Sequence, residues 1–234
     1  MDKNILIQLK NVDFSYDDES VLRNISFDVD KKGITLIYGE NGSGKTSILR
    51  IISGLLYPSK GTISNLSKIN IGFIFQKSIL LRRTVKENLL HTLHAKNKLT
   101  YSESVEVIRK VLTKFNLIDL IDKHVMKLSG GQQQMISFCR SIIMEPELLI
   151  CDEPNNNLDD ANKKLLYDFL EEYSKFNKVL IVSQDKDEIS NICSSIYNIK
   201  DGLVNQLGRS SILFIVYLGR LKVENIWLGL QTMG

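Results

Sequence analysis

Residues 39–46 read Gly-Glu-Asn-Gly-Ser-Gly-Lys-Thr, which completes the phosphate-loop pattern G-x-x-x-x-G-K-[ST]. The apolar run Ile34–Tyr38 precedes this loop, and apolar residues recur at helical spacing over Thr46–Leu55 after it. A strand, a glycine loop and a helix in this order form the context in which the pattern binds phosphate, because the loop N–H groups and the helix N-terminus both attract an anion. The stretch therefore predicts a nucleotide triphosphate site in an α/β fold.

The residue types within the loop fit this chemistry. Gly42 and Gly44 let the backbone approach the phosphates closely, and Lys45 supplies a positive charge. The hydroxyl of Thr46 is placed to ligate Mg²⁺. The loop residues that we expect to contact the nucleotide are Gly39, Glu40, Asn41, Gly42, Ser43, Gly44, Lys45, Thr46 and Ser47.

The apolar patterns elsewhere in the chain predict two kinds of strand. Ile5–Phe14 and Ile25–Val29 alternate apolar and polar residues, which indicates an antiparallel pair at the start of the chain. Ile71–Phe75, Leu148–Cys151 and Val179–Val182 are continuous apolar runs, as expected for parallel strands covered on both faces. We predict an α/β, RecA-like phosphate-loop core with an N-terminal antiparallel β subdomain.

The pattern from Thr84 to about Leu128 is helical and lies between two predicted core strands. Thr100 and Glu103 have the spacing of a capping box, which marks a helix start. We therefore predict that a helical subdomain, at about residues 84–140, is inserted into a domain spanning 1–207. The remaining residues, 208–234, form a C-terminal tail that could be a docking strand and helix, a dimer contact or a segment unrelated to the fold.

Two acidic residues follow the apolar strand at 148–151. Asp152 ends this strand, where its carboxylate can hold Mg²⁺ through water. Glu153 comes next and can face an attacking water as a general base. The alternative is that both acids merely cap the next helix, with Pro154 in its first turn.

Three motifs in fixed order carry a family resemblance. The phosphate loop is followed by Leu-Ser-Gly-Gly-Gln at residues 128–132 and by Leu-Leu-Ile-Cys-Asp-Glu at 148–153. In this order they resemble the ATP-binding subunits of ABC transporters, and the resemblance covers residues 5 to about 207. It implies ATP as the nucleotide and a head-to-tail dimer, in which each ATP lies between the phosphate loop of one subunit and the signature motif of the other. The signature residues that this implies as nucleotide contacts are Ser129, Gly130, Gly131 and Gln132.

The family resemblance also implies roles for single residues outside the three motifs. Tyr16 lies upstream of the loop where the family has an aromatic that stacks on adenine; the alternative is a core or turn aromatic. Gln76 resembles the residue that ligates Mg²⁺ and senses the permease. Asp159 matches the end of the segment called the D-loop, in which Asn156 replaces the usual serine.

One position departs from the family in a way that affects catalysis. Where the family has a histidine after the strand at 179–182, this chain has Gln184. The histidine hydrogen-bonds the γ-phosphate, and a glutamine amide can still donate a hydrogen bond although it cannot titrate. Because Glu153 is present, we expect hydrolysis to be slowed by Gln184 but not abolished, with Glu153 and Gln184 as the catalytic residues.

Composition limits the class of protein. The 234 residues are 43% hydrophobic and 24% charged, with a net charge of +3, so we expect a globular protein and no nucleic-acid partner. The longest apolar run, Ile212–Leu218, is far shorter than the roughly 20 residues of a transmembrane helix. Scattered Cys139, Cys151 and Cys193 fit a reducing cytosol, each as a small core hydrophobe.

The family resemblance also implies partners and a location. It predicts a cytoplasmic subunit, held on the inner membrane face by an integral-membrane permease and served indirectly by a solute-binding protein. Its dimer partner is a second copy or a paralogous ATPase. Two segments resemble those of importer subunits for small oxyanions, tungstate above all: the short arm before Gln76 and the Leu-Arg-Arg-Thr-Val run at 81–85. The alternative is that the arginines of this run are simply solvated. The alternatives are an ATP-gated dimerising clamp with little turnover and a non-transport ABC protein.

Overall fold

The computed structural model describes residues 4–64, 69–95, 99–187 and 189–207. The described residues form two compact units, one within 4–64 and 180–207 and the other within 69–179. The predicted tail at 208–234 lies outside the described residues, so its role stays a prediction.

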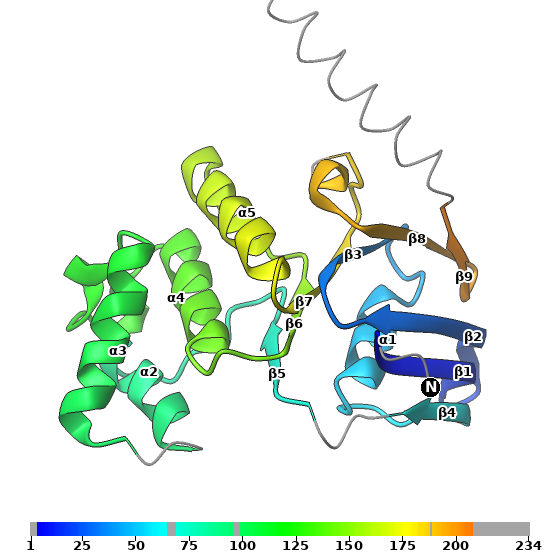
Figure 1. The fold of residues 1–234 in the computed structure, drawn as a ribbon, viewed down its shortest axis with the longest axis horizontal. Coiled ribbons are helices and arrows are strands. Elements are labelled where there is room, and N and C mark those ends of the chain that lie inside the picture. The colour runs from blue at the N-terminus through cyan, green and yellow to red at the C-terminus, as the bar shows by residue number, and fades with distance from the viewer. Residues whose placement is uncertain (1–3, 65–68, 96–98, 188, 208–234) are drawn as a thin grey trace, which may run out of the picture. The chain divides into compact units, whose positions relative to one another are not determined.

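An antiparallel sheet opens the first unit (Figure 1). It contains β1 (Ile5–Tyr16), β2 (Glu19–Asp30) and β4 (Lys60–Ser64) in the order β2-β1-β4. A two-residue turn joins β1 to β2, with Asp17 in the left-handed region at φ 47°. The structure confirms the predicted antiparallel pair and adds β4, whose largely exposed residues gave no apolar alternation to detect.

The phosphate loop belongs to the second sheet of this unit. β3 (Gly33–Tyr38) pairs in parallel with β8 (Ser195–Lys200), which pairs antiparallel with β9 (Leu203–Gln206). The residues of β7 (Lys178–Ser183) from Leu180 onward border β3 on its other side. α1 (Lys45–Ile52) follows the loop and ends before Leu55, because Gly54 turns the chain at φ 74°. The three-residue 3₁₀ helix η4 (Ser190–Ile192) precedes β8.

The second unit combines a parallel strand pair with helices. β5 (Ile71–Ile74) pairs in parallel with β6 (Leu148–Asp152), and the chain between them is mainly helical. The predicted capping box at Thr100 and Glu103 is confirmed. The helices of this unit are α2 (Val85–His94), α3 (Tyr101–Lys114), η2 (Ile118–Leu120), η3 (Val125–Lys127), α4 (Gly130–Ile142) and α5 (Asp160–Ser174).

Aromatic rings join three of these helices into one core. Phe115 after α3, Phe138 of α4 and Phe169 of α5 contact one another edge to face, with ring centroids 5.1, 5.2 and 5.3 Å apart. Apolar burial of this size stabilises a helix more than its intrinsic propensity does. The core therefore holds the start of α4, which carries the signature motif, in a defined position within its unit.

The observed elements confirm the predicted fold class, a mixed α/β architecture with parallel strands and a small antiparallel β subdomain. Among the residues that the structure describes, none of the helices has the length and apolar character required to cross a bilayer.

Candidate nucleotide site

The backbone of the phosphate loop can be built only with glycine at several positions. Gly42 and Gly44 have φ angles of 78° and 102°, in the region that side chains disfavour. A Cβ on Gly39 would lie 2.3 Å from the carbonyl oxygen of Ile199, and one on Gly44 would lie 2.8 Å from Leu22. The glycines therefore allow both the turn and its close packing against β2 and β8.

Lys45 closes this loop on itself. Its side chain is buried at 6% exposure, and Nζ donates hydrogen bonds of 2.8 Å to the carbonyl oxygens of both Gly39 and Glu40. A lysine ammonium has three hydrogen-bond donors and a compact charge. The residue thus shapes the loop and brings a positive charge to it.

The N-terminus of α1 is suited to an anion. Its first turn reads Lys-Thr-Ser, and the N-cap is Gly44, which offers no side-chain cap. The N–H groups of a helix N-terminus and the helix dipole both favour negative charge at this point. The hydroxyl of Ser43 is buried without a hydrogen-bond partner among the described residues, which a phosphate oxygen would supply. These features fit a bound phosphate.

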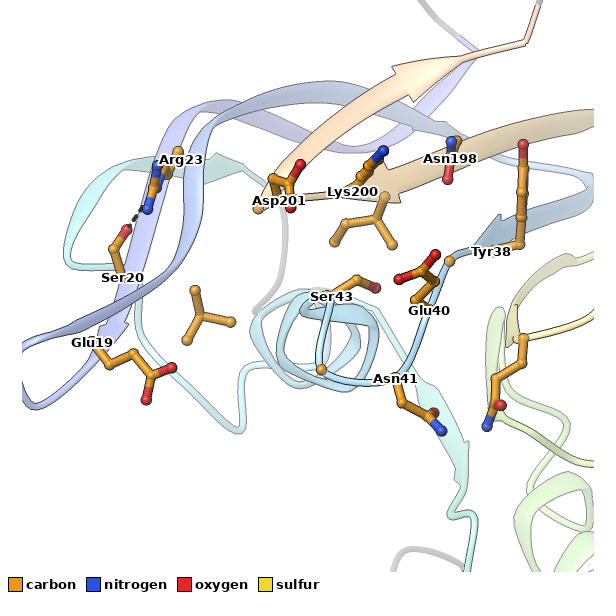
Figure 2. Close-up of a pocket in the computed structure, with 16 residues that line it drawn as sticks. Glu19, Ser20, Arg23, Tyr38, Glu40, Asn41, Ser43, Asn198, Lys200 and Asp201 are labelled. Atoms are coloured by element: carbon orange, nitrogen blue, oxygen red, sulfur yellow. Dashed lines mark hydrogen bonds between the residues drawn. The ribbon is translucent and has the colours of Figure 1, made fainter.

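A pocket of about 1030 Å³ lies against the loop within this unit. In Figure 2, Glu40 and Ser43 extend toward β8, which carries Asn198 and Lys200, whereas Asn41 extends from the opposite side of the loop. The structure therefore brings Gln184, which also lines this pocket, together with the phosphate-loop residues.

Tyr16 stands apart from that pocket. It is 44% exposed at the end of β1, and its ring packs edge to face on Phe14 at 4.8 Å. It pairs across the hairpin with Glu19, which does line the pocket. The ring is therefore accessible for stacking beside the pocket, and its contact with adenine stays a prediction.

In the second unit, Asp152 and Glu153 are both buried, at 5% and 8% exposure. Glu153 has φ 47°, an unfavourable backbone conformation for a residue with a side chain. Its Oε2 accepts hydrogen bonds from the amide of Gln76 at 2.9 Å and from that of Asn156 at 2.8 Å. Burial raises the pKa of the neighbouring Cys151 thiol, so this cysteine is an inert part of the core.

Strand register explains why Gln76 reaches Glu153. Ile74 of β5 pairs with Cys151 of β6, and the strands run in parallel, so the residues two positions further on lie side by side. The carboxyl ends of parallel strands meet at one edge of a sheet, where ligand sites form. Because Gln76 Nε2 faces Glu153, its amide oxygen is directed elsewhere and can serve as a metal ligand.

The signature motif forms the capped start of α4. Ser129 Oγ accepts from the N–H of Gln132 at 3.2 Å, and Gln132 Oε1 accepts from the N–H of Ser129 at 3.1 Å. Ser129 and Gly130 are exposed to solvent, and a Cβ on Gly130 would meet nothing within 4 Å. Gly131 is more restricted, because a Cβ there would lie 2.8 Å from the carbonyl oxygen of Asn157.

Asp159 has a structural role in this unit. It is the N-cap of α5, and its Oδ1 accepts from the N–H of Asn162 at 2.8 Å. A nucleotide contact of Asp159 stays a prediction alongside that role.

Two features of the site were not predicted from the sequence. The [ST]-x-x-[EQ] pattern at Ser129 and Gln132 could have revealed a third capping box, beside those of α2 and α3. The contact of Asn156 with Glu153 had no comparable signal, because it depends on the turn between the two residues. The predicted site residues therefore divide into a phosphate-loop group with Gln184 in the first unit and a group around Glu153 in the second.

Comparison with known proteins gives consistent results. Residues 22–156 match the family model described as ABC transporter. The chain is 34% identical over 223 residues to the spermidine/putrescine import ATP-binding protein PotA of Acetivibrio thermocellus, covering 89% of this chain and 62% of that protein. It is 35% identical over 201 residues to the lipoprotein-releasing system ATP-binding protein LolD of Buchnera aphidicola, covering 77% of this chain and 88% of the relative. Among solved structures, CbiO1 of Clostridium perfringens, part of the ABC transporter complex CbiONQ, superposes with a TM-score of 0.80 at 24% identity, covering 99% of this chain and 100% of that one.

Proposed function

We propose that this chain, which belongs to the ABC transporter family of ATP-binding proteins, hydrolyses Mg-ATP to power a membrane permease. The family match supports ATP binding, and the chain spans only 62% of the length of the polyamine relative. The residues of the site itself support hydrolysis and its coupling to transport.

The buried carboxylate of Glu153 is the observation that carries this proposal. Two amide N–H groups fix its Oε2, at the end of a strand where a general base can face a water molecule. A carboxylate that only capped the next helix would point at backbone N–H groups of that helix, and Asp159 already caps α5. Glu153 takes a proton from the attacking water, whereas Lys45 and the loop N–H groups hold the phosphates.

Gln184 completes the phosphate-loop side of the reaction. It lines the pocket beside the loop, and its amide donates to the γ-phosphate where the family uses histidine. Tyr16 stacks on the adenine from the edge of the same unit.

The residue types that the family resemblance implies as metal ligands also suit Mg²⁺. Thr46, Asp152 and the amide oxygen of Gln76 would hold the ion, since hydroxyl, carboxylate and carbonyl oxygens are its preferred ligands. When bound, the metal neutralises charge on the phosphates.

The signature helix supplies the second face of the site from another subunit. Ser129 and Gly130 are exposed at the N-terminus of α4, where the helix dipole and N–H groups attract a phosphate. ATP held between this helix end and the phosphate loop of a partner would join two subunits head to tail, either two copies or this chain and a paralogous ATPase.

A groove in the second unit suits the permease. It has a volume of about 300 Å³ and is lined by apolar and basic side chains that include Phe73, His91 and Arg140. Arg140 donates to the carbonyl oxygen of Ile79, whose side chain is 54% exposed in the segment after Gln76. A cytoplasmic helix of the permease would dock in this groove, placing the chain on the cytoplasmic face of the inner membrane.

The compact arm before Gln76 supports import of a small oxyanion such as tungstate, with a solute-binding protein outside the membrane. The matched relatives belong to systems with different cargoes: one imports spermidine and putrescine, and the other releases lipoproteins. Transport assays with the neighbouring permease would identify the solute.

The variant Glu153→Gln tests the proposed function. It removes the base and keeps the size of the side chain, so turnover should fall at least about a hundredfold while ATP binding persists. ATP trapped between two subunits should also make the variant dimeric in sedimentation with Mg-ATP. Glu106→Gln, at an exposed position of α3, is the matched control and should retain turnover. Wild-type turnover in folded Glu153→Gln would overturn the assignment of the base.

A further inference from the structure

We propose that Asn156 is a positioning residue for Glu153, and that its amide N–H sets the rate of hydrolysis. This inference rests on the proposed role of Glu153 as the general base. It concerns the position at which this chain has asparagine where the family usually has serine.

Two amides from separate elements hold one oxygen atom of Glu153. Asn156 Nδ2 donates to Glu153 Oε2 at 2.8 Å, and Gln76 Nε2 donates to the same oxygen at 2.9 Å. A carboxylate only accepts hydrogen bonds, so each amide must present its nitrogen and not its oxygen. Both distances are in the range of charge-assisted hydrogen bonds.

The turn after β6 brings Asn156 back to Glu153. The N–H of Asn156 donates to the carbonyl oxygen of Glu153 at 3.3 Å, and the N–H of Leu158 donates to that of Asn155 at 3.2 Å. Glu153 starts this turn in the left-handed region, and Asn157 continues it at φ 65°. The contact of Asn156 is therefore local to the turn, whereas that of Gln76 comes from the end of β5.

Two donors on one oxygen restrict what the carboxylate can do. Turning the carboxyl group partway out of its plane would stretch both hydrogen bonds, so the two amides hold that plane. Asn156 thus helps set the orientation in which the carboxylate of Glu153 meets the attacking water.

Three substitutions distinguish the contribution of the Asn156 N–H donor to kcat from that of the side chain's shape. Asn156→Ala removes the donor and should lower kcat about tenfold, with KM for ATP within about twofold. Asn156→Ser keeps a shorter donor and should lie between Asn156→Ala and wild type. Asn156→Asp keeps the shape but replaces the donor with a second carboxylate, so it should be the slowest, about a hundredfold below wild type.

This order distinguishes positioning from packing. If Asn156 only filled space, the isosteric Asn156→Asp would be milder than Asn156→Ala, and that result would overturn the inference. Equal kcat for Asn156→Ala and wild type would also overturn it. Asn116→Asp, at an exposed left-handed position of the same unit, is the control for the charge and should leave kcat unchanged.

The two proposals fail in different ways. If Glu153→Gln keeps wild-type turnover, the general base is wrongly assigned and the inference falls with it. If Glu153→Gln loses turnover and the Asn156 variants do not, only the role of Asn156 is wrong. Thermal unfolding and ATP binding, measured on each full-length variant, confirm that the protein is folded and loaded.

Discussion

α3 and α4 lie in the same unit and begin with the same capping box, but the two boxes differ in charge. In α3, Thr100 Oγ1 accepts from the N–H of Glu103 at 3.3 Å, and Glu103 Oε2 accepts in return at 2.7 Å. In α4, Ser129 and Gln132 form the equivalent bonds at 3.2 and 3.1 Å. Each box therefore gives hydrogen-bond partners to backbone N–H groups at the start of its helix, but only the box of α3 contains a carboxylate.

This difference follows what each helix N-terminus is proposed to do. A carboxylate in the first turn stabilises a helix by opposing the positive end of its dipole, and it repels other anions. Acidic residues occur in the first turns of α2, α3 and α5, whereas those of α1 and α4 read Lys-Thr-Ser and Gly-Gly-Gln. The two helices proposed to hold phosphate therefore begin without a negative charge.

The substitution Gln132→Glu should produce the largest effect, because it gives α4 the box of α3. The fold should be kept, since Glu caps as well as Gln. A carboxylate about 4 Å from a bound phosphate costs about 4 kcal/mol at an effective dielectric of about 20, so turnover should fall a hundredfold or more. Steady-state hydrolysis and ATP-dependent sedimentation would measure both consequences.

The reverse substitution, Glu103→Gln, is the matched control. It gives α3 the neutral box of α4 and should leave turnover unchanged. If Gln132→Glu remained as active as the wild type, the N-terminus of α4 would not be facing a phosphate during the reaction.

The substitution Gln184→His sharpens the same comparison on the phosphate-loop side. Gln184 lines the pocket beside the loop and, like Gln132, is a neutral amide. If the amide only partly replaces the imidazole contact, recovering a hydrogen bond of about 1–3 kcal/mol should raise turnover roughly five- to a hundredfold. ATP affinity should change far less, because Lys45 and the loop amides already hold the phosphates. A variant no faster than the parent would show that glutamine suffices, and the clamp hypothesis would lose its support.

These regions also show what could be predicted from the sequence. The phosphate loop, the strand before Asp152 and the box at Thr100 rest on short patterns with a local cause, and the structure confirms the fold class built on them. β4 and the extra length of β2 were not predicted, because most of their residues are exposed and their strand structure depends on pairing with β1. The amides around Glu153 come from a parallel strand and from a turn, so no spacing rule could place them together.

The substitutions Ser129→Ala and Thr100→Ala should have similar effects on stability and different effects on function. Each removes a capping hydroxyl, and each should lower the free energy of unfolding by about 1 kcal/mol. Only Ser129→Ala also removes a proposed phosphate contact, so it alone should slow hydrolysis, about tenfold. Denaturant unfolding and hydrolysis assays on the pair would check this. Equal turnover of the two variants would mean that the hydroxyl of Ser129 serves only the helix.

The smallest expected effect is a difference in pH dependence between the two boxes. Hydrogen bonds from the Thr100 side chain and backbone lower the pKa of Glu103 below its ordinary value of about 4.3. Because the folded-state pKa is depressed, the stabilisation by Glu103 is present above about pH 4.3 and is lost as the pH falls through the folded-state value. Wild type should therefore be more stable than Glu103→Gln at pH 7, and the difference should shrink on acidification below about pH 4.3.

The box of α4 contains no titrating group, so the difference in stability between wild type and Ser129→Ala should stay constant over the same range. Thermal unfolding of all three proteins between about pH 7 and 3 measures both differences directly, and a Glu103→Gln difference that did not vary with pH would show that the charge of Glu103 does not stabilise α3.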